Sequence, residues 1–490
     1  MRKWWPLVAI CTGAFMLLVD VTIVTVALPD MAHGLKTSFS ALQWVMDIYA
    51  LVLAALLLSA GAVADLVGRR RVYVLGLVVF ALSSLACGIA PNSTVLVTAR
   101  GVQGLGAAAM FATTMALLNS TYQGRDRGVA FGIWGAVNGA AAAAGPILGG
   151  LLTTQFGWRW VFLVNLPVSL LALGLTVRVV RESRNPHARG VDLPGMVTFT
   201  AAAGAVTYGL IRAGDDGWGS TAALVSLAAG LVALVVFVAV ELRTRRPMLE
   251  LRLFRNPSFS AIMIAAALLS IAAFAYTPYL SVWLQSVLEL SAIQAGLVLL
   301  PMSVMAFVVA GAGGRILHDA SPRLVIGGGL LLIGVGAMAQ AVLSAGSGWA
   351  AVLTGLGISG AGVGLATPTL ASAGMAAVPV ERSGMAAGAV NTFRQLGFAL
   401  GIALLGGIFH DGLQHTVHSK GLAAALSGGQ AQRTGAPRHL VHQAFAHGLN
   451  VTLLTAGGIG LAAGLLVLAL VRRPAPHPAP PVAEPVPAGQ

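Results

Sequence analysis

The sequence predicts an all-α protein that crosses a membrane many times, and three observations lead to this fold class. Of the 490 residues, 57% are hydrophobic and only 9% are charged, whereas soluble domains contain about 25% charged residues. Apolar runs of roughly 20 residues, long enough to span a bilayer as a helix, recur along most of the chain. The 61 glycines suit helices that approach one another closely in lipid.

Fourteen apolar runs have the length and composition of spanning helices. The predicted spans cover residues 7–28, 42–63, 72–90, 95–119, 128–152, 159–178, 191–212, 220–241, 258–280, 292–313, 322–344, 348–370, 384–408 and 449–472. An even number places both chain ends on one side. The apolar run after Arg2-Lys3 is too long for a signal peptide, so we expect an uncleaved first span.

The basic residues predict which side that is. Loops on the side of the N-terminus hold 21 Lys and Arg, and loops on the opposite side hold 6. Because cytosolic loops carry the excess of Lys and Arg, we expect both termini in the cytosol of a bacterial cell. The net charge of +13 is spread over short clusters rather than one patch, so we expect no nucleic-acid partner.

The chain repeats itself after about half its length, with an offset of 254 residues between the first matched acids. The matching pairs are Asp65 and Arg69 with Asp319 and Arg323, and Asp126-Arg127 with Glu381-Arg382. The repeat predicts two six-helix bundles, residues 1–178 and 258–472, and two extra helices within 179–257 between them. We expect a polar external loop over 409–447 with a short amphipathic end. Residues 473–490 are Pro-rich and are expected to form a disordered cytosolic tail.

Asp20 lies inside the first apolar run, with no counter-charge nearby in the sequence. An acid in lipid is costly and usually marks a functional site. Helical rise places Asp20 roughly 20 Å above the cytosolic edge of its span. It places Asp47 and Arg100 roughly 22 Å above the cytosolic edges of their own spans. We therefore predict one polar cluster of these three residues for proton coupling. Structural hydrogen bonding of the acids and snorkelling of the arginine are the alternatives.

Three glycine-containing motifs follow in chain order. "GAVADLVGRRR" combines Gly61, Asp65, Gly68, Arg69 and Arg70 between the second and third spans. We expect close packing at both glycines and a charge latch that breaks when two bundles rock, with simple topology control as the alternative.

The fourth span, "ARGVQGLGAAAM", carries Gln103 beside Arg100, and we place Gln103 on a possible substrate pathway. The fifth span holds "GPILGG", with Gly145, Pro146, Gly149 and Gly150, which predicts a kinked and tightly packed helix.

Arg394 lies near the middle of the thirteenth span, and Asn391 precedes it by one turn. Arg394 could face the substrate pathway together with Asn391, or it could pair with an acid that locks the packing. The sequence leaves both open.

These motifs together resemble the major facilitator superfamily. "GAVADLVGRRR" resembles its cytosolic loop signature, and the fourth-span motif resembles one whose arginine assists proton transfer. "LLVDVTIVTVALP" resembles the first-helix signature of the fourteen-span drug/proton antiporters, with Thr25 in place of the usual Asn, and "GPILGG" resembles their antiporter motif. "WRWVFLVNLPV", "DLPG" and "NTFRQLGFALGIALLG" are similar to the same subfamily. The resemblance covers residues 7–472 and implies the major facilitator fold with two extra central helices.

Within this subfamily the second span is informative. Asp47 stands where many members have Thr, and some exporters of quaternary ammonium antiseptics and dyes have an aspartate there. Their additional acid in the tenth span is missing from "AGLVLLPMSVMAFVVAGAG", which argues against divalent-cation handling.

The remaining residues exclude other chemistry. Six histidines lie in the predicted external loop, but no cysteine or carboxylate shell accompanies them, so we favour a solvated loop over a metal site. These are His410, His415, His418, His439, His442 and His447. Cys11 and Cys87 lie in apolar runs, where buried inert thiols are favoured over a disulfide. No nucleotide motif or catalytic triad appears, so we expect neither an enzyme nor a cofactor.

The sequence thus predicts a monomeric, proton-driven exporter in the bacterial cytoplasmic membrane. Its substrates are expected to be small hydrophobic or cationic drugs, antiseptics or natural-product antibiotics. An uptake symporter on the same fold, or a membrane sensor that has lost transport, is the alternative.

Overall fold

The computed structural model describes residues 2–37, 39–184, 190, 192–244, 247, 249–316, 320–378 and 383–471. The predicted tail 473–490 lies outside the described residues, as do Asp319, Glu381 and Arg382 of the repeat. The described part of the chain contains helices and no strand.

The first half of the chain forms six spanning segments because its apolar runs exceed the thickness of a bilayer. They are α1 (Trp5–Leu35), α2 (Phe39–Val67), α3 (Arg69–Gly88), α4 (Ser93–Thr121), α5 (Gly124–Phe156), and α6 (Trp160–Leu163) with α7 (Asn165–Val179). Two further helices follow, α8 (Leu193–Asp216) and α9 (Thr221–Arg243).

The second half adds six more segments and one short helix. They are α10 (Pro257–Phe274) with α11 (Thr277–Ser286), α12 (Ala292–Ile316), α13 (Pro322–Gln340), α14 (Leu353–Ala376), α15 (Ser383–Val417), the short α16 (Lys420–Ser427), and α17 (Arg438–Leu470). Short 3-10 turns are η1 (Arg2–Trp4), η2 (Leu251–Arg255), η3 (Trp349–Val352) and η5 (Ala431–Arg433).

Each of the fourteen predicted spans falls on one of these helices or on a consecutive pair. Counted over the described residues alone, 13 helices are long and apolar enough to cross a membrane. The all-α polytopic fold class is therefore confirmed.

The prediction of a long polar loop over 409–447 is wrong in extent. Helix α15 continues to Val417, and α17 already begins at Arg438, with α16 between them. Hydropathy marks only the part of a helix that lies in lipid, whereas backbone hydrogen bonding continues into polar residues beyond it. The predicted amphipathic end of the loop is the first part of α17.

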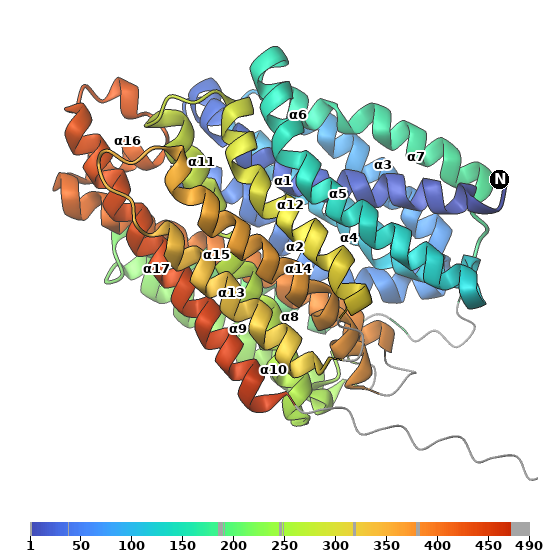
Figure 1. The fold of residues 1–490 in the computed structure, drawn as a ribbon. Helices are drawn as coiled ribbons and strands as arrows, with labels where there is room; N and C mark the ends of the chain where they lie inside the picture. Colours follow the sequence, from blue (N-terminus) through green and yellow to red (C-terminus); the bar gives the residue numbers. More distant parts are fainter. Residues whose placement is uncertain are drawn as a thin grey trace, which may run out of the picture.

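The two halves have the same internal packing. In the first half α4 contacts α2 and α3, and α5 contacts α1. In the second half α14 contacts α12 and α13, and α15 contacts α10, which are the corresponding pairs after the sequence offset. Figure 1 shows these bundles as a blue-to-teal group and a yellow-to-red group.

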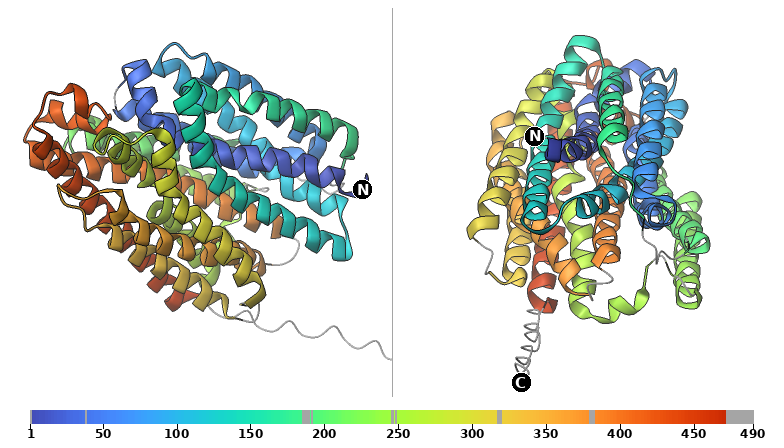
Figure 2. Two further views of the ribbon diagram at one scale, coloured as in Figure 1. Left: turned by 45° about the horizontal axis from the view of Figure 1, so that its top comes forward. Right: turned by 90° about the vertical axis from the view of Figure 1, so that its right-hand side faces the viewer.

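The interface between the bundles repeats the same correspondence. Helix α5 packs on α12, and α15 packs on α2. Helix α8 contacts both α2 and α15, so the extra pair α8 and α9 lies beside this interface (Figure 2). We call the end of the molecule that holds Arg2 the proximal face, and the end that holds α16 the distal face (Figure 1).

Candidate functional site

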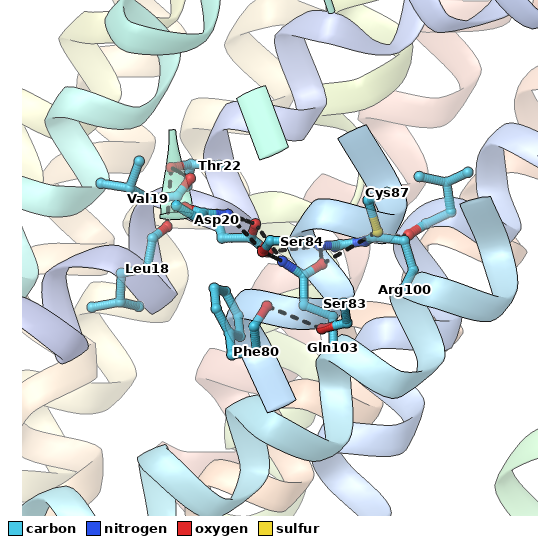
Figure 3. Close-up of polar contacts among 12 residues, drawn as sticks. Leu18, Val19, Asp20, Thr22, Phe80, Ser83, Ser84, Cys87, Arg100 and Gln103 are labelled. Carbon is cyan, nitrogen blue, oxygen red and sulfur yellow. Dashed lines mark hydrogen bonds and ion pairs between the residues drawn. The ribbon is translucent and has the colours of Figure 1, made fainter. Parts of the chain in front are cut away.

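Asp20 lies in the middle of α1, and its side chain is fully buried. Apolar residues surround it along the whole helix, because the run is hydrophobic on every face. A carboxylate in such a place is stable only with strong partners. The structure supplies them from α4 and α7, as Figure 3 shows in part.

Three donors converge on the Asp20 carboxylate. Arg100 of α4 donates from Nη1 to Oδ2 at 2.6 Å, which forms an ion pair. Gln103 donates from Nε2 to Oδ1 at 3.1 Å, and Asn165 donates from Nδ2 to the same oxygen at 2.8 Å. Both carboxylate oxygens are therefore satisfied, and the predicted pairing of Asp20 with Arg100 is present in the fold.

Arg100 is held by further contacts on its other side. Its Nε donates to the carbonyl oxygen of Val45 on α2 at 3.0 Å, and its Nη1 also donates to Oε1 of Gln103 at 2.7 Å. The guanidinium carbon lies 4.2 Å from the centre of the Tyr49 ring, at cation–π distance. With only 2% of its surface exposed, Arg100 does not snorkel to an interface.

Gln103 and Asn165 also share a third partner. The Ser84 hydroxyl of α3 accepts from Gln103 at 2.7 Å and from Asn165 at 3.3 Å. Gln103 was expected on a substrate pathway, but it is fully buried inside the first bundle. Its amide instead links Asp20 to Ser84. Four helices, α1, α3, α4 and α7, thus build one buried polar network.

Asp47 does not belong to this network, which corrects the prediction of a three-residue cluster. Its side chain is fully buried, yet neither carboxylate oxygen has a hydrogen-bond partner in the described part of the chain. Helical rise predicts the height of a residue along α2 but not the side of the helix from which its side chain projects.

The loop between α2 and α3 is short, and its charges pair as the sequence suggested. Arg69 contacts Oδ1 of Asp65 at 2.8 Å through both Nε and Nη2. Gly68 has a φ of +127° and lies between the two helices, so a side chain there would be strained. Gly61 does not need to be glycine: it lies inside α2, and the nearest heavy atom to an added Cβ is 4.0 Å away.

A further acid at this loop was missed from the sequence. Glu182, just beyond α7, accepts from the backbone N–H of Arg70 at 3.0 Å and of Arg71 at 3.2 Å. It therefore caps the start of α3, where unpaired N–H groups attract a carboxylate. The sequence could have indicated this role, because Glu182 directly follows the sixth span and lies among several arginines.

The "GPILGG" stretch makes the closest contacts of α5. A Cβ added to Gly149 would lie 2.8 Å from the carbonyl oxygen of Ile23 on α1, and one added to Gly145 would overlap Thr22. Gly150 faces the other bundle, where an added Cβ would lie 2.5 Å from the carbonyl oxygen of Ala292.

Pro146 on the same stretch is buried, and its carbonyl oxygen lies against Gly296 of α12. The glycines thus permit α5 to pack on α1 and α12 at once, which is the tight packing that the sequence predicts.

Arg394 and Asn391 lie on α15 and are half-buried. No ion pair holds Arg394 among the described residues, and its Nε is buried without a hydrogen-bond partner. The described residues therefore provide no acid that would lock Arg394 in the packing.

The distal histidines form contacts of their own. Nδ1 of His410 lies 3.3 Å from the Ser427 hydroxyl, and the ring of His415 lies 5.5 Å from that of His447. Among the described residues no group of three or more His, Cys, Asp or Glu side chains is arranged to hold a metal ion. Cys11 and Cys87 are buried free thiols.

Two packed, duplicated helical bundles with a charged network inside one of them define a polytopic membrane protein of the transporter type. The model of the Major Facilitator Superfamily matches residues 10–402. The chain belongs to this family, and the fourteen-span exporter resemblance is borne out.

Similar proteins agree with this assignment. The chain is 38% identical over 412 residues to the multidrug resistance protein Stp of Mycobacterium tuberculosis (strain CDC 1551 / Oshkosh), covering 84% of this chain and 76% of the relative. It is 31% identical to the tetracenomycin C resistance and export protein of Streptomyces glaucescens, and the match covers 99% of this chain and 95% of that relative. A solved peptide transporter, POT in complex with sulfate, shares the fold with a TM-score of 0.64 at 18% identity over 95% and 94% of the two chains.

Proposed function

We propose that the protein is a proton-coupled exporter of small hydrophobic or cationic drugs, antiseptics or natural-product antibiotics, working by alternating access. The relatives named for drug resistance and export support the substrate class and the direction. One observation carries the coupling proposal: the ion pair of Asp20 and Arg100 is fully buried among spanning helices.

The network offers a way to couple a proton to a conformational change. Losing one partner of a buried ion pair costs about 3–5 kcal/mol. A proton that neutralises Asp20 would leave Arg100 without its counter-charge, so the helices that hold them would favour another arrangement. Asp20 and Arg100 therefore act as the proton site. Asp47, which has no ion pair among the described residues, is not needed for this step.

We place the proximal face in the cytosol of a bacterial cell, with the distal face outside. The excess of Lys and Arg in the proximal loops supports this orientation. Distal contacts then close the outer side: Gln285 of α11 donates to the carbonyl oxygen of Val26 on α1 at 2.8 Å. In the same orientation the Asp65–Arg69 pair and Glu182 form the cytosolic latch beside the bundle interface.

A substrate cavity between the bundles would be largely apolar. The interface already contains a small cavity near the distal face, lined among others by Met46, Tyr279 and Ile402. Methionine and aromatic side chains provide surfaces that adapt to ligands of different shape. No cofactor is needed, since the proton gradient supplies the energy.

The test is Asp20→Asn in inverted membrane vesicles, with a panel of dyes, antiseptics and antibiotics. Asparagine keeps the size of the side chain and can still accept from Arg100, but it carries no titratable proton. We expect proton-driven accumulation of substrate to fall at least about tenfold, because a barrier change of 1.4 kcal/mol already gives that factor. Asp216→Asn, in the half-exposed pair with Arg212 at 3.5 Å, is the matched control and should transport normally.

Three results would contradict the proposal. If the Asp20 variant accumulates substrate as well as the parent does, Asp20 is not the proton site. Accumulation by right-side-out vesicles under the natural gradient, with none in inverted vesicles, would instead indicate an uptake symporter. A protein that moves neither substrate nor protons would fit a sensor.

A further inference from the structure

Asp47 and Asp20 are both fully buried acids of the first bundle, but among the described residues only Asp20 has hydrogen-bonding and ion-pair partners. Both oxygens of Asp47 are buried and lack a hydrogen bond in the described part of the chain. Burying an unpaired polar or charged group is costly. Asp20 shows that this fold can surround a carboxylate with three donors, so the bare surroundings of Asp47 need their own explanation.

The neighbours of Asp47 on α2 show which way this side of the helix faces. Gln43, one turn earlier, donates to the carbonyl oxygen of Ile402 on α15 at 3.3 Å. Ala50 and Leu51, one turn later, pack with Ala399 of α15. Residues three and four apart share one face of a helix. Asp47 therefore lies on the side of α2 that meets the opposite bundle.

Arg394 is the matching case on α15. Its Nε is buried without a hydrogen-bond partner, and the described residues place no carboxylate in an ion pair with it. Helix α15 is packed between α2, α8, α10, α14 and α17, so the guanidinium is inside the protein rather than in lipid. Among the described residues, an acid without a hydrogen bond and a base without an ion pair thus come from the two bundles that meet at the interface.

The register of the antiparallel pair α2 and α15 gives their separation along the interface. Gln43 lies level with Ile402, and Leu58 lies level with Gly388, whose added Cβ would be 2.6 Å from the leucine side chain. Counting from either contact, Asp47 and Arg394 are four or five residues apart, which is roughly 6–8 Å at 1.5 Å per residue. Arg394 is the one nearer the proximal face.

We propose that Asp47 and Arg394 together bind an amphoteric substrate, with its protonated amine on Asp47 and its carboxylate or other anionic group on Arg394. This inference rests on the proposed export function and names its substrate class. A ligand with both charges would satisfy both buried groups, whereas a purely cationic or anionic ligand would leave one of them unpaired. Because the groups belong to different bundles, such a ligand also bridges the two parts that move.

The test uses three fluorescent xanthenes of almost equal shape: a rhodamine with a free carboxylate, its methyl ester, and fluorescein. They are respectively zwitterionic, cationic and anionic. Binding to the full-length protein in lipid nanodiscs is measured by fluorescence anisotropy, without a proton gradient. We expect the zwitterion to bind at least about tenfold more tightly than the other two, since each added charge-assisted contact can contribute that factor.

Two variants assign the two charges. Arg394→Gln should abolish the preference for the zwitterion over its ester without weakening the ester. Asp47→Asn should weaken binding of both rhodamines, whose positive charge lies on the xanthene iminium, and leave fluorescein unchanged, a pattern that general misfolding would not produce. Arg212→Gln, in the half-exposed pair with Asp216, is the control and should bind like the parent.

Equal binding of the zwitterion and its ester, or no binding of the zwitterion, would overturn this inference. The outcome is separate from that of the export proposal. If the protein transports cationic dyes but shows no preference for the zwitterion, the proposed substrate class is wrong and the export proposal still stands. If the predicted binding pattern is found but no proton-driven transport occurs, the export proposal is wrong and the binding proposal still stands.

Discussion

At the scale of single residues, the buried network depends on amide donors as much as on the ion pair. Among the described residues, Oδ1 of Asp20 accepts from the amides of Gln103 and Asn165, while Arg100 contacts the other oxygen. Asn165 begins α7, and its amide also donates to the Ser84 hydroxyl of α3. Its amide therefore joins the sixth span to the proposed proton site.

Asn165→Leu should weaken transport without removing the titratable acid. Leucine has nearly the same volume but donates nothing, so Oδ1 of Asp20 loses a hydrogen bond, at a cost of about 1–3 kcal/mol for a buried group. We expect proton-driven transport in inverted vesicles to fall roughly tenfold or more, and thermal stability to drop.

Ser169→Ala on the same helix is the control for that change, because the Ser169 hydroxyl contacts only Met16 near the network, at 3.1 Å. It should stay close to the parent in both measurements. Normal transport by Asn165→Leu would mean that the amide has no part in coupling.

The residues of the site were predictable to different degrees. Counting helical rise brought Asp20 and Arg100 together, because depth in a membrane is a one-dimensional quantity that the sequence contains. The same count wrongly added Asp47, since the side of a helix that faces a given neighbour depends on packing. Asn165 stands in a quoted motif, but nothing in the sequence alone shows that α7 returns beside α1.

At the scale of elements, α5 is the helix that connects one bundle to the other. Gly149 allows its close approach to α1, and Gly150 allows its approach to α12. Both glycines lie toward the distal end, where the bundles meet. We therefore expect this contact to matter for closing the distal side.

Gly150→Leu should prevent this closure. A Cβ alone would lie 2.5 Å from the backbone of Ala292 and of Ile293, so a leucine must push α5 and α12 apart. Overpacking of this kind costs about 1–3 kcal/mol. We expect transport to fall to about a tenth or less in inverted vesicles, with near-normal membrane insertion and yield.

Gly174→Leu on α7 is the matched control, because nothing lies within 4 Å of an added Cβ there. It should transport as the parent does. If Gly150→Leu transports equally well, α5 and α12 do not need to touch during the cycle.

The elements themselves were largely predictable, and their ends were not. Each of the fourteen apolar runs falls on a helix or on two consecutive helices, and 13 helices in the described part of the chain are long and apolar enough to cross a membrane, because length and hydrophobicity are what lipid requires. The ends of α15 and α17 extend past the predicted spans into the supposed loop 409–447. Those extensions depend on contacts such as that between His410 and Ser427 of α16, which hydropathy does not register.

At the scale of the whole molecule, the sequence repeat predicted the architecture because it is carried by both bundles. Equivalent helices make equivalent contacts within each half, and the contacts of α5 with α12 and of α2 with α15 are equivalent as well. Two bundles related in this way can rock about their shared interface, closing one face as the other opens. Which face is cytosolic then decides the direction of transport.

Single cysteines on the two faces test that orientation. Ser419 lies on the distal face and Arg255 on the proximal face, and both are exposed. The native Cys11 and Cys87 are buried at 7% and 0% exposure, so they add little background. In intact cells a membrane-impermeant maleimide should label Ser419→Cys and not Arg255→Cys, whereas permeabilised cells should give labelling of both. Labelling of Arg255→Cys but not Ser419→Cys in intact cells would reverse the orientation, and with it the assignment of the Asp65–Arg69 latch to the cytosol.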